Sequence, residues 1–89
     1  MRSVTTARFR KAFEKLPPDI QQRARQAYNL WKENPYHPGL HFKQIHQTQL
    51  IFSVRISLSY RAMGIKEEDE MIWFWIGSHE EYNNLIKQM

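Results

Sequence analysis

The chain has 89 residues, no cysteine and a formal net charge of +4. That length suits one domain with a single core, and the lack of cysteine excludes disulfides and thiolate zinc sites. The first residues hold no apolar run, and no apolar stretch approaches the roughly 20 residues of a membrane span. We therefore expect one domain over residues 1–89, located in the cytoplasm, with no signal peptide and no membrane partner.

The charge is distributed unevenly along the chain. Residues 1–62 carry eleven basic and three acidic side chains, a net of +8, whereas residues 63–89 carry two basic and six acidic ones, a net of −4. Most of the acidic excess comes from residues 67–70, which are typical of a solvated hairpin tip. A basic body suggests a polyanionic or acidic partner. Five of its charges are better explained as solvated outer helix faces, namely Arg8, Arg10, Lys11, Arg23 and Arg25.

Two helices are predicted first. Thr5 or Thr6 can cap a helix over residues 7–15, which presents an apolar stripe at helical spacing and ends at Pro17-Pro18. Pro18 suits the first position of a second helix over 18–33, which should stop before Pro35. The short connection makes the pair a helical hairpin.

Four strands are expected after the loop at residues 34–40, around 41–46, 50–56, 60–65 and 71–76. The second alternates cleanly between apolar and mixed positions. Short connections at 57–59 and 66–70 make these strands an antiparallel meander. The predicted fold class is therefore α+β: a helical hairpin on a twisted antiparallel sheet of about four strands, followed by a short helix.

The last strand runs directly into the last helix. Residues 72–76 are all large and apolar, as expected of a strand covered on both faces. Ser78 followed by Glu81 has the spacing of a capping box, so His79 becomes the first helical residue and Tyr82 lies one turn on. Histidine is not a favoured first-turn residue, which makes His79 a candidate general acid or base. Tyr82 fits either a packed ring or a site residue.

The second and third strands each contribute one arginine. A three-residue turn at 57–59 sets Arg55 directly opposite Arg61 and pairs Ile56 with Tyr60 on the other face. Two opposed arginines repel each other by a few tenths of a kcal/mol or more. A protein tolerates that most readily when an anion sits between them. A two-residue turn would instead put the arginines on opposite faces.

The candidate site resembles what RNA cleavage without a metal requires. A base must take the proton of the 2′-hydroxyl, an acid must protonate the departing 5′-oxygen, and fixed cations must stabilise the phosphorane. Arginine provides such a cation in planar, bidentate form, and tyrosine can stack on a base. The residues that we select are Lys43, Arg55, Arg61, His79 and Tyr82.

Other chemistries fit poorly. His37 and His41 flank Pro38-Gly39, and His41 and His46 would point to opposite sides of a strand, so no metal site is predicted. Ser78 is explained as a cap, and neither a nucleophile elbow nor a glycine-rich phosphate loop occurs. No cofactor is expected.

Several motifs, in this order and spacing, resemble the RelE/ParE superfamily of bacterial type II toxin–antitoxin toxins. The likeness is greatest to the branch with a Gly-Ser-His junction before the last helix. The motifs are Phe9-Arg10-Lys11-Ala12-Phe13 with Leu16-Pro17, Trp31 with Asn34-Pro35, Phe52-Ser53-Val54-Arg55-Ile56 with Tyr60-Arg61-Ala62, and Trp75-Ile76-Gly77-Ser78-His79.

The resemblance implies roles for these residues. In cleaving members an arginine after a tyrosine on the third strand contacts the scissile phosphate, and Arg61 matches it. Arg55 matches a basic residue on the second strand, His79 an acid at the junction, and Tyr82 approximately a stacking aromatic. Members usually begin with a strand, which here would be missing or very short. This chain also has fewer lysines near the site.

The expected function is that of a toxin that cleaves mRNA on the ribosome and so inhibits translation. The resemblance implies a cognate antitoxin as partner, with the ribosome and mRNA as targets and DNA contacted only through an antitoxin complex. Two alternatives remain: a ParE-like inhibitor of DNA gyrase without nuclease activity, and a non-toxic binding relative. Trp73 and Trp75 fit the core, or alternatively an antitoxin groove.

Overall fold

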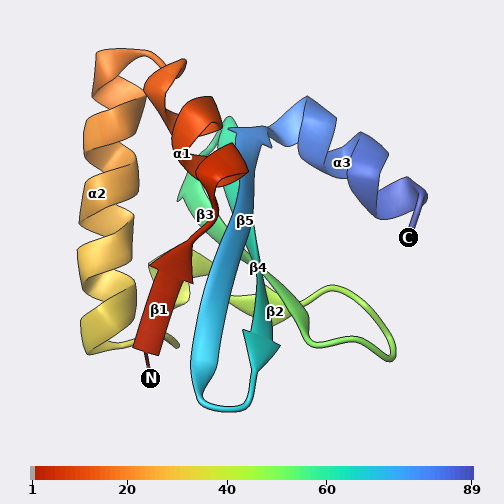
Figure 1. Ribbon diagram of the computed structural model, residues 1–89. Helices are drawn as coiled ribbons and strands as arrows, with labels where there is room; N and C mark the ends of the chain where they lie inside the picture. Colours follow the sequence, from red (N-terminus) through yellow and green to blue (C-terminus); the bar gives the residue numbers. More distant parts are fainter. Residues whose placement is uncertain (1) are drawn as a thin grey trace.

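The computed structural model describes residues 2–89. Its elements are, in order, β1 (Arg2–Thr5), α1 (Ala7–Glu14), α2 (Pro18–Glu33), the short 3₁₀-helix η1 (Pro38–Leu40), β2 (Lys43–Gln44), β3 (Ile51–Ser57), β4 (Tyr60–Glu67), β5 (Glu70–Ser78) and α3 (His79–Lys87). The predicted α+β class is confirmed, with five strands where about four were expected (Figure 1).

Both helices of the hairpin begin at predicted signals. The Thr6 hydroxyl accepts a hydrogen bond from the Phe9 amide at 3.1 Å, which satisfies one of the free N–H groups at the start of α1. Pro18 occupies the first position of α2, where its missing N–H costs nothing. The second helix covers the predicted range, and the first ends one residue earlier than predicted.

The sheet has the order β1-β5-β4-β3-β2, and β1 runs parallel to β5 while the other neighbours are antiparallel. The sequence allowed for a first strand that is missing or very short, and β1 is a short strand of four residues. Its pairing extends into the start of α1, because the Thr6 amide donates to the Trp73 carbonyl at 3.0 Å. The sheet is therefore mixed and not purely antiparallel.

The strand predicted over 41–46 shrinks to Lys43–Gln44. On one side, His41 adopts a left-handed backbone conformation, with φ 48° and ψ 40°, which cannot continue a strand. On the other side, the Gln44 side-chain amide donates to the carbonyls of His46 and Gln49, and the His46 ring accepts from the Gln49 amide. These local bonds replace the ladder hydrogen bonds.

The connection from β3 to β4 corrects one predicted pairing. The turn contains two residues, Leu58 and Ser59, and not three. Tyr60 pairs with Ser57 and not with Ile56, which is the extra residue of a β-bulge. The bulge adds back the residue that the shorter turn removes. Arg55 therefore still pairs directly with Arg61, as the three-residue turn predicted.

The core lies between the helical hairpin and one face of the sheet, and α3 extends from the end of β5 on the other side (Figure 1). Trp31 is buried at its centre, edge-on to Trp73 with ring centroids 5.2 Å apart. The opposite face is covered less completely, since Trp75 is only half-buried there. Within residues 2–89, no helix is both long enough and apolar enough to cross a membrane.

Gly64 lies in β4 opposite a second bulge, where β5 fits one extra residue between Trp73 and Trp75. A Cβ at Gly64 would lie 2.8 Å from Cε3 of Trp73 and 2.9 Å from Sδ of Met71. We expect Gly64→Ala to lower the free energy of unfolding by about 1–3 kcal/mol, because the core must shift to admit a methyl group. Urea denaturation measures this loss.

The matched control is Gly39→Ala, on the exposed η1 turn, where the nearest atom to an added Cβ is the His37 Nδ1 at 3.3 Å. There the change should stay within about 0.5 kcal/mol. Equal losses in the two variants would contradict the packing argument.

Candidate active site

Arg55 and Arg61 lie side by side on the face of the sheet that turns away from the helical hairpin. Val54 and Ala62 are buried in the core, and successive side chains of a strand alternate between faces. Their neighbours Arg55 and Arg61 therefore share the opposite face, directly across β3 and β4. The same alternation places Ser53 on this face, and Lys43 pairs with it from β2. Lys43 is exposed, one row from the arginines.

The two positive charges act on each other. Burial lowers the pKa of Arg61 from its usual value, the charge of Arg55 lowers it further, and nearby Tyr82 opposes both effects. The guanidinium nevertheless stays protonated at any physiological pH. An anion between the two side chains would relieve the repulsion, since it would offset both the burial and the like charge.

Each arginine is held by one terminal nitrogen. Nη1 of Arg61 donates to the carbonyls of Ser57, at 2.5 Å, and Tyr60, at 2.9 Å, so this side chain is anchored to the β3–β4 turn. Nη1 of Arg55 lies 3.2 Å from Nε2 of His41. A guanidinium has five N–H donors, so both arginines keep donors for a phosphate.

His79 begins α3, as predicted. The Ser78 hydroxyl accepts from the Glu81 amide at 3.2 Å and the Glu81 carboxylate accepts from the Ser78 amide at 3.3 Å, which completes the capping box. The His79 amide also donates to the Ser59 carbonyl at 2.7 Å. This bond ties the start of α3 to the turn that holds Arg61.

Tyr82 connects His79 to the arginine face. Its hydroxyl donates to the Ser53 hydroxyl at 2.9 Å, and its ring centroid lies 6.0 Å from that of His79. The structure therefore brings Arg55, Arg61 and His79 to one face of the sheet. Tyr82 itself is only 6 % exposed. Its ring is therefore packed between α3 and the sheet. It could stack on a nucleotide base only if α3 moved.

Two members of this arrangement were not predicted from the sequence. Ser53 is 2 % exposed and receives the Tyr82 hydroxyl, and the only signal for it is a small polar residue within an apolar strand. His41, beside Arg55, was considered only as a metal ligand. No local pattern indicates its position, because it depends on the register of β2 against β3. Among residues 2–89 no cluster of three potential metal ligands occurs.

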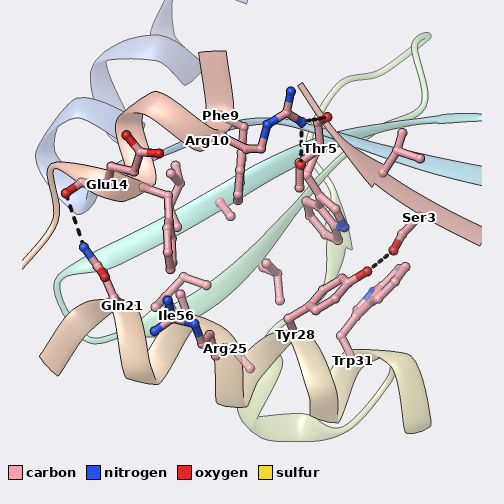
Figure 2. Close-up of a pocket in the computed structure, with 18 residues that line it drawn as sticks. Ser3, Thr5, Phe9, Arg10, Glu14, Gln21, Arg25, Tyr28, Trp31 and Ile56 are labelled. Carbon is pink, nitrogen blue, oxygen red and sulfur yellow. Dashed lines mark hydrogen bonds between the residues drawn. The ribbon is translucent and has the colours of Figure 1, made fainter. Parts of the chain in front are cut away.

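A cavity of about 640 Å³ lies on the other side of the sheet, beneath the helical hairpin. Figure 2 shows its mostly apolar wall, which includes Phe9, Tyr28 and Trp31, with Arg10 and Arg25 at its edge. Arg10 donates to the Thr5 carbonyl at 2.6 Å. This cavity lies on the hairpin side and not on the arginine face, because its lining residues from β3, β4 and β5 belong to the core or pack against it.

Comparison with solved structures places this architecture among the RelE and ParE toxins. RelE in the RelB–RelE complex from Methanococcus jannaschii gives a TM-score of 0.74 at 14% identity, with 92% of this chain and 96% of that chain covered. The YoeB/ParE toxin from Agrobacterium tumefaciens gives 0.69 at 13% identity, covering 89% and 99%. The isolated RelE toxin of E. coli gives 0.67 at 14% identity, covering 98% and 96%. At such identities the likeness shows the fold.

The sequence itself shows the family. The model of the ParE-like toxin domain matches residues 18–84, so this chain belongs to the ParE-like toxin domain family. No curated protein matches it in sequence. The RelE/ParE resemblance is thereby confirmed at the level of the superfamily, and the Gly-Ser-His branch stays a prediction.

The Ser53–Tyr82 hydrogen bond fixes α3 against the arginine face. We expect Tyr82→Phe to lower the free energy of unfolding by about 1–3 kcal/mol, because it leaves the buried Ser53 hydroxyl without its donor. Chemical denaturation measures the loss. Replacing Ser53 with Ala as well should recover part of it, since no unpaired polar group then remains.

Tyr36→Phe is the control, because Tyr36 is 76 % exposed and water satisfies its hydroxyl. Its stability should match that of the unchanged protein. A double variant at Ser53 and Tyr82 that loses the full sum of both single effects would exclude the coupling.

Proposed function

We propose that this protein is the toxin of a type II toxin–antitoxin module and that it cleaves mRNA bound to the ribosome without a metal ion. The observation that carries the proposal is the opposed pair Arg55 and Arg61 with His79 bordering the same face. The family supports the toxin assignment, and the site supports the chemistry.

The pair suits the charge that develops during phosphodiester cleavage. When the 2′-oxygen attacks, the phosphorus becomes five-coordinate and gains negative charge on its oxygens. The Arg61 guanidinium, which two carbonyls already hold in place, stabilises this charge with little reorganisation, and Arg55 adds a second cation directly opposite it. Lys43 adds a third positive charge for the RNA backbone on the neighbouring strand.

His79 provides proton transfer at the edge of this anion site. Its backbone is fixed by the capping box and by the bond to Ser59, so its ring is presented from a rigid junction. A positioned acid or base contributes about 10²–10⁴-fold to the rate. Tyr82 has no step of its own here, since it packs beneath the site and keeps His79 in place.

A cognate antitoxin is the proposed protein partner. The RelE chains from Methanococcus jannaschii and Pyrococcus horikoshii were solved as complexes with RelB. Residues 1–62 of this chain carry a net charge of +8, which suits an acidic partner. The apolar cavity under the hairpin offers a seat for a hydrophobic segment of that partner. Action on ribosomes would place the toxin in the cytoplasm.

The second candidate function is inhibition of DNA gyrase, which membership of the ParE-like family also allows. A gyrase inhibitor would act through surface contacts and would have no use for His79. The opposed arginines favour the nuclease, because a protein that binds no phosphate at this face has no reason to keep their repulsion.

In the test, the purified protein is added to ribosomes that carry a defined mRNA, and the new 5′ ends of the mRNA are mapped. We expect codon-phased cuts, reduced about 10²–10³-fold by Arg61→Ala and 10²–10⁴-fold by His79→Ala. The matched control is Arg23→Ala, on the exposed surface of α2, which should cleave normally.

Plasmid supercoiling by gyrase is measured in parallel. Loss of negative supercoiling without mRNA cuts would reject the nuclease function and support inhibition of gyrase. If neither mRNA cuts nor loss of supercoiling is observed, the protein would be a binding relative without toxic activity.

A further inference from the structure

The turn between β3 and β4 presents an apolar side chain to solvent close to the arginine pair. Leu58 is 77 % exposed, as much as any large hydrophobic side chain in residues 2–89. It begins the two-residue turn that leads into β4, three residues before Arg61. The side chain is therefore available to a molecule that binds at the arginine face.

The turn itself does not require leucine at this position. Neither Leu58 nor Ser59 has a positive φ, so the backbone here suits most residue types. Tight turns favour small polar residues and glycine, because these supply local hydrogen bonds or unusual backbone angles. Leu58 also lies outside the core and the side chains packed against it. Folding alone therefore gives no reason for an apolar residue here.

Hydrogen bonds tie this turn to both chemical groups of the site. Nη1 of Arg61 donates to the Ser57 carbonyl at 2.5 Å and lies 3.5 Å from the Leu58 carbonyl. The Ser59 carbonyl accepts from the His79 amide at 2.7 Å. The Ser59 amide donates to the Ser57 hydroxyl at 3.3 Å, which braces the turn. Leu58 thus lies between the residue that anchors the Arg61 guanidinium and the residue that anchors the start of α3.

We propose that Leu58 is a wedge that inserts between the two bases flanking the cut, a role that rests on the proposed RNA cleavage. Proteins that kink nucleic acids insert apolar side chains between base steps, and leucine is one of them. The surroundings favour RNA over a protein segment as the occupant. Arg55 and Arg61 lie beside the turn, and residues 34–66 contain no carboxylate that would repel a phosphate backbone.

Opening the base stack would serve the reaction directly. In helical RNA, neighbouring bases are stacked, and the 2′-oxygen does not lie in line with the phosphorus and the departing 5′-oxygen. Rotating the two nucleotides apart brings these three atoms into line, which is the geometry that the displacement requires. Leu58 forms no bond to the reacting atoms and is therefore a positioning residue. Its contribution to the rate should depend on how strongly the two bases stack.

The first test uses Leu58→Ser and Leu58→Met in the ribosome assay. Both variants should unfold at the same urea concentration as the unchanged protein, since the side chain is exposed. Cleavage by Leu58→Ser should fall about 10–10²-fold, whereas Leu58→Met keeps an apolar side chain and should cleave at nearly the normal rate.

The matched control is Leu50→Ser, a second exposed leucine, which precedes β3 at the far end of that strand from the turn. It should cleave normally. Normal cleavage by Leu58→Ser would overturn the inference, leave the proposed function intact and assign Leu58 to a protein contact instead.

The second test distinguishes a wedge from a general contact with the ribosome. The mRNA contains many codons, and each mapped cut is sorted by the base step that it splits. Pyrimidine–purine steps separate easily, whereas purine–purine steps stack strongly. The loss in Leu58→Ser, relative to the unchanged protein, should be about 10-fold larger at purine–purine steps.

Arg61→Ala provides the comparison, because removal of a phosphate contact should lower cleavage equally at both kinds of step. A uniform loss in Leu58→Ser would overturn the wedge, as would an unchanged protein that cuts only at pyrimidine–purine steps. If the unchanged protein cuts no mRNA at all, the proposed function itself is rejected.

Discussion

The site depends on one constraint: the backbone ladder between β3 and β4 holds two guanidinium groups opposite each other. Val54 and Ala62 bury their side chains in the core one residue away from Arg55 and Arg61. A slip of one residue would move these apolar side chains into water and the arginines into the core. Burial of the hydrophobic face therefore maintains an unfavourable charge pair on the polar face. In the proposed function this charge pair binds the phosphate.

Local patterns in the sequence were sufficient for most of the fold. The helix-start signals at Thr6, Pro18 and Ser78 lie where they were predicted, because the start of a helix depends on residues within one helical turn. The sequence could not show whether the first strand is missing or very short, because β1 pairs with β5, which lies near the other end of the chain. The Ile56 bulge was missed for another reason: turn length and bulge compensate, so alternation alone cannot tell them apart.

The site was predictable where it depends on alternation and on the helix start. Alternation with a three-residue turn predicted Arg55 opposite Arg61, and the capping box predicted His79 at the first position of the last helix. The burial of Tyr82 could not be read in the same way, because it depends on how α3 folds back to reach Ser53. The position of His41 could not be predicted, because its backbone is left-handed. Most left-handed positions carry glycine or asparagine, so a histidine gives no sign of this conformation in the sequence.

The two edge strands limit how another chain can join the sheet. β1 has four residues and β2 has two, and an edge this short presents few unpaired amides and carbonyls. A strand added at either side would gain only a small number of backbone hydrogen bonds, and such bonds discriminate poorly between sequences. Any protein that associates tightly with this domain must therefore recognise its side chains on the helical surface or on the arginine face. The same brevity protects the free domain from edge-to-edge polymerisation.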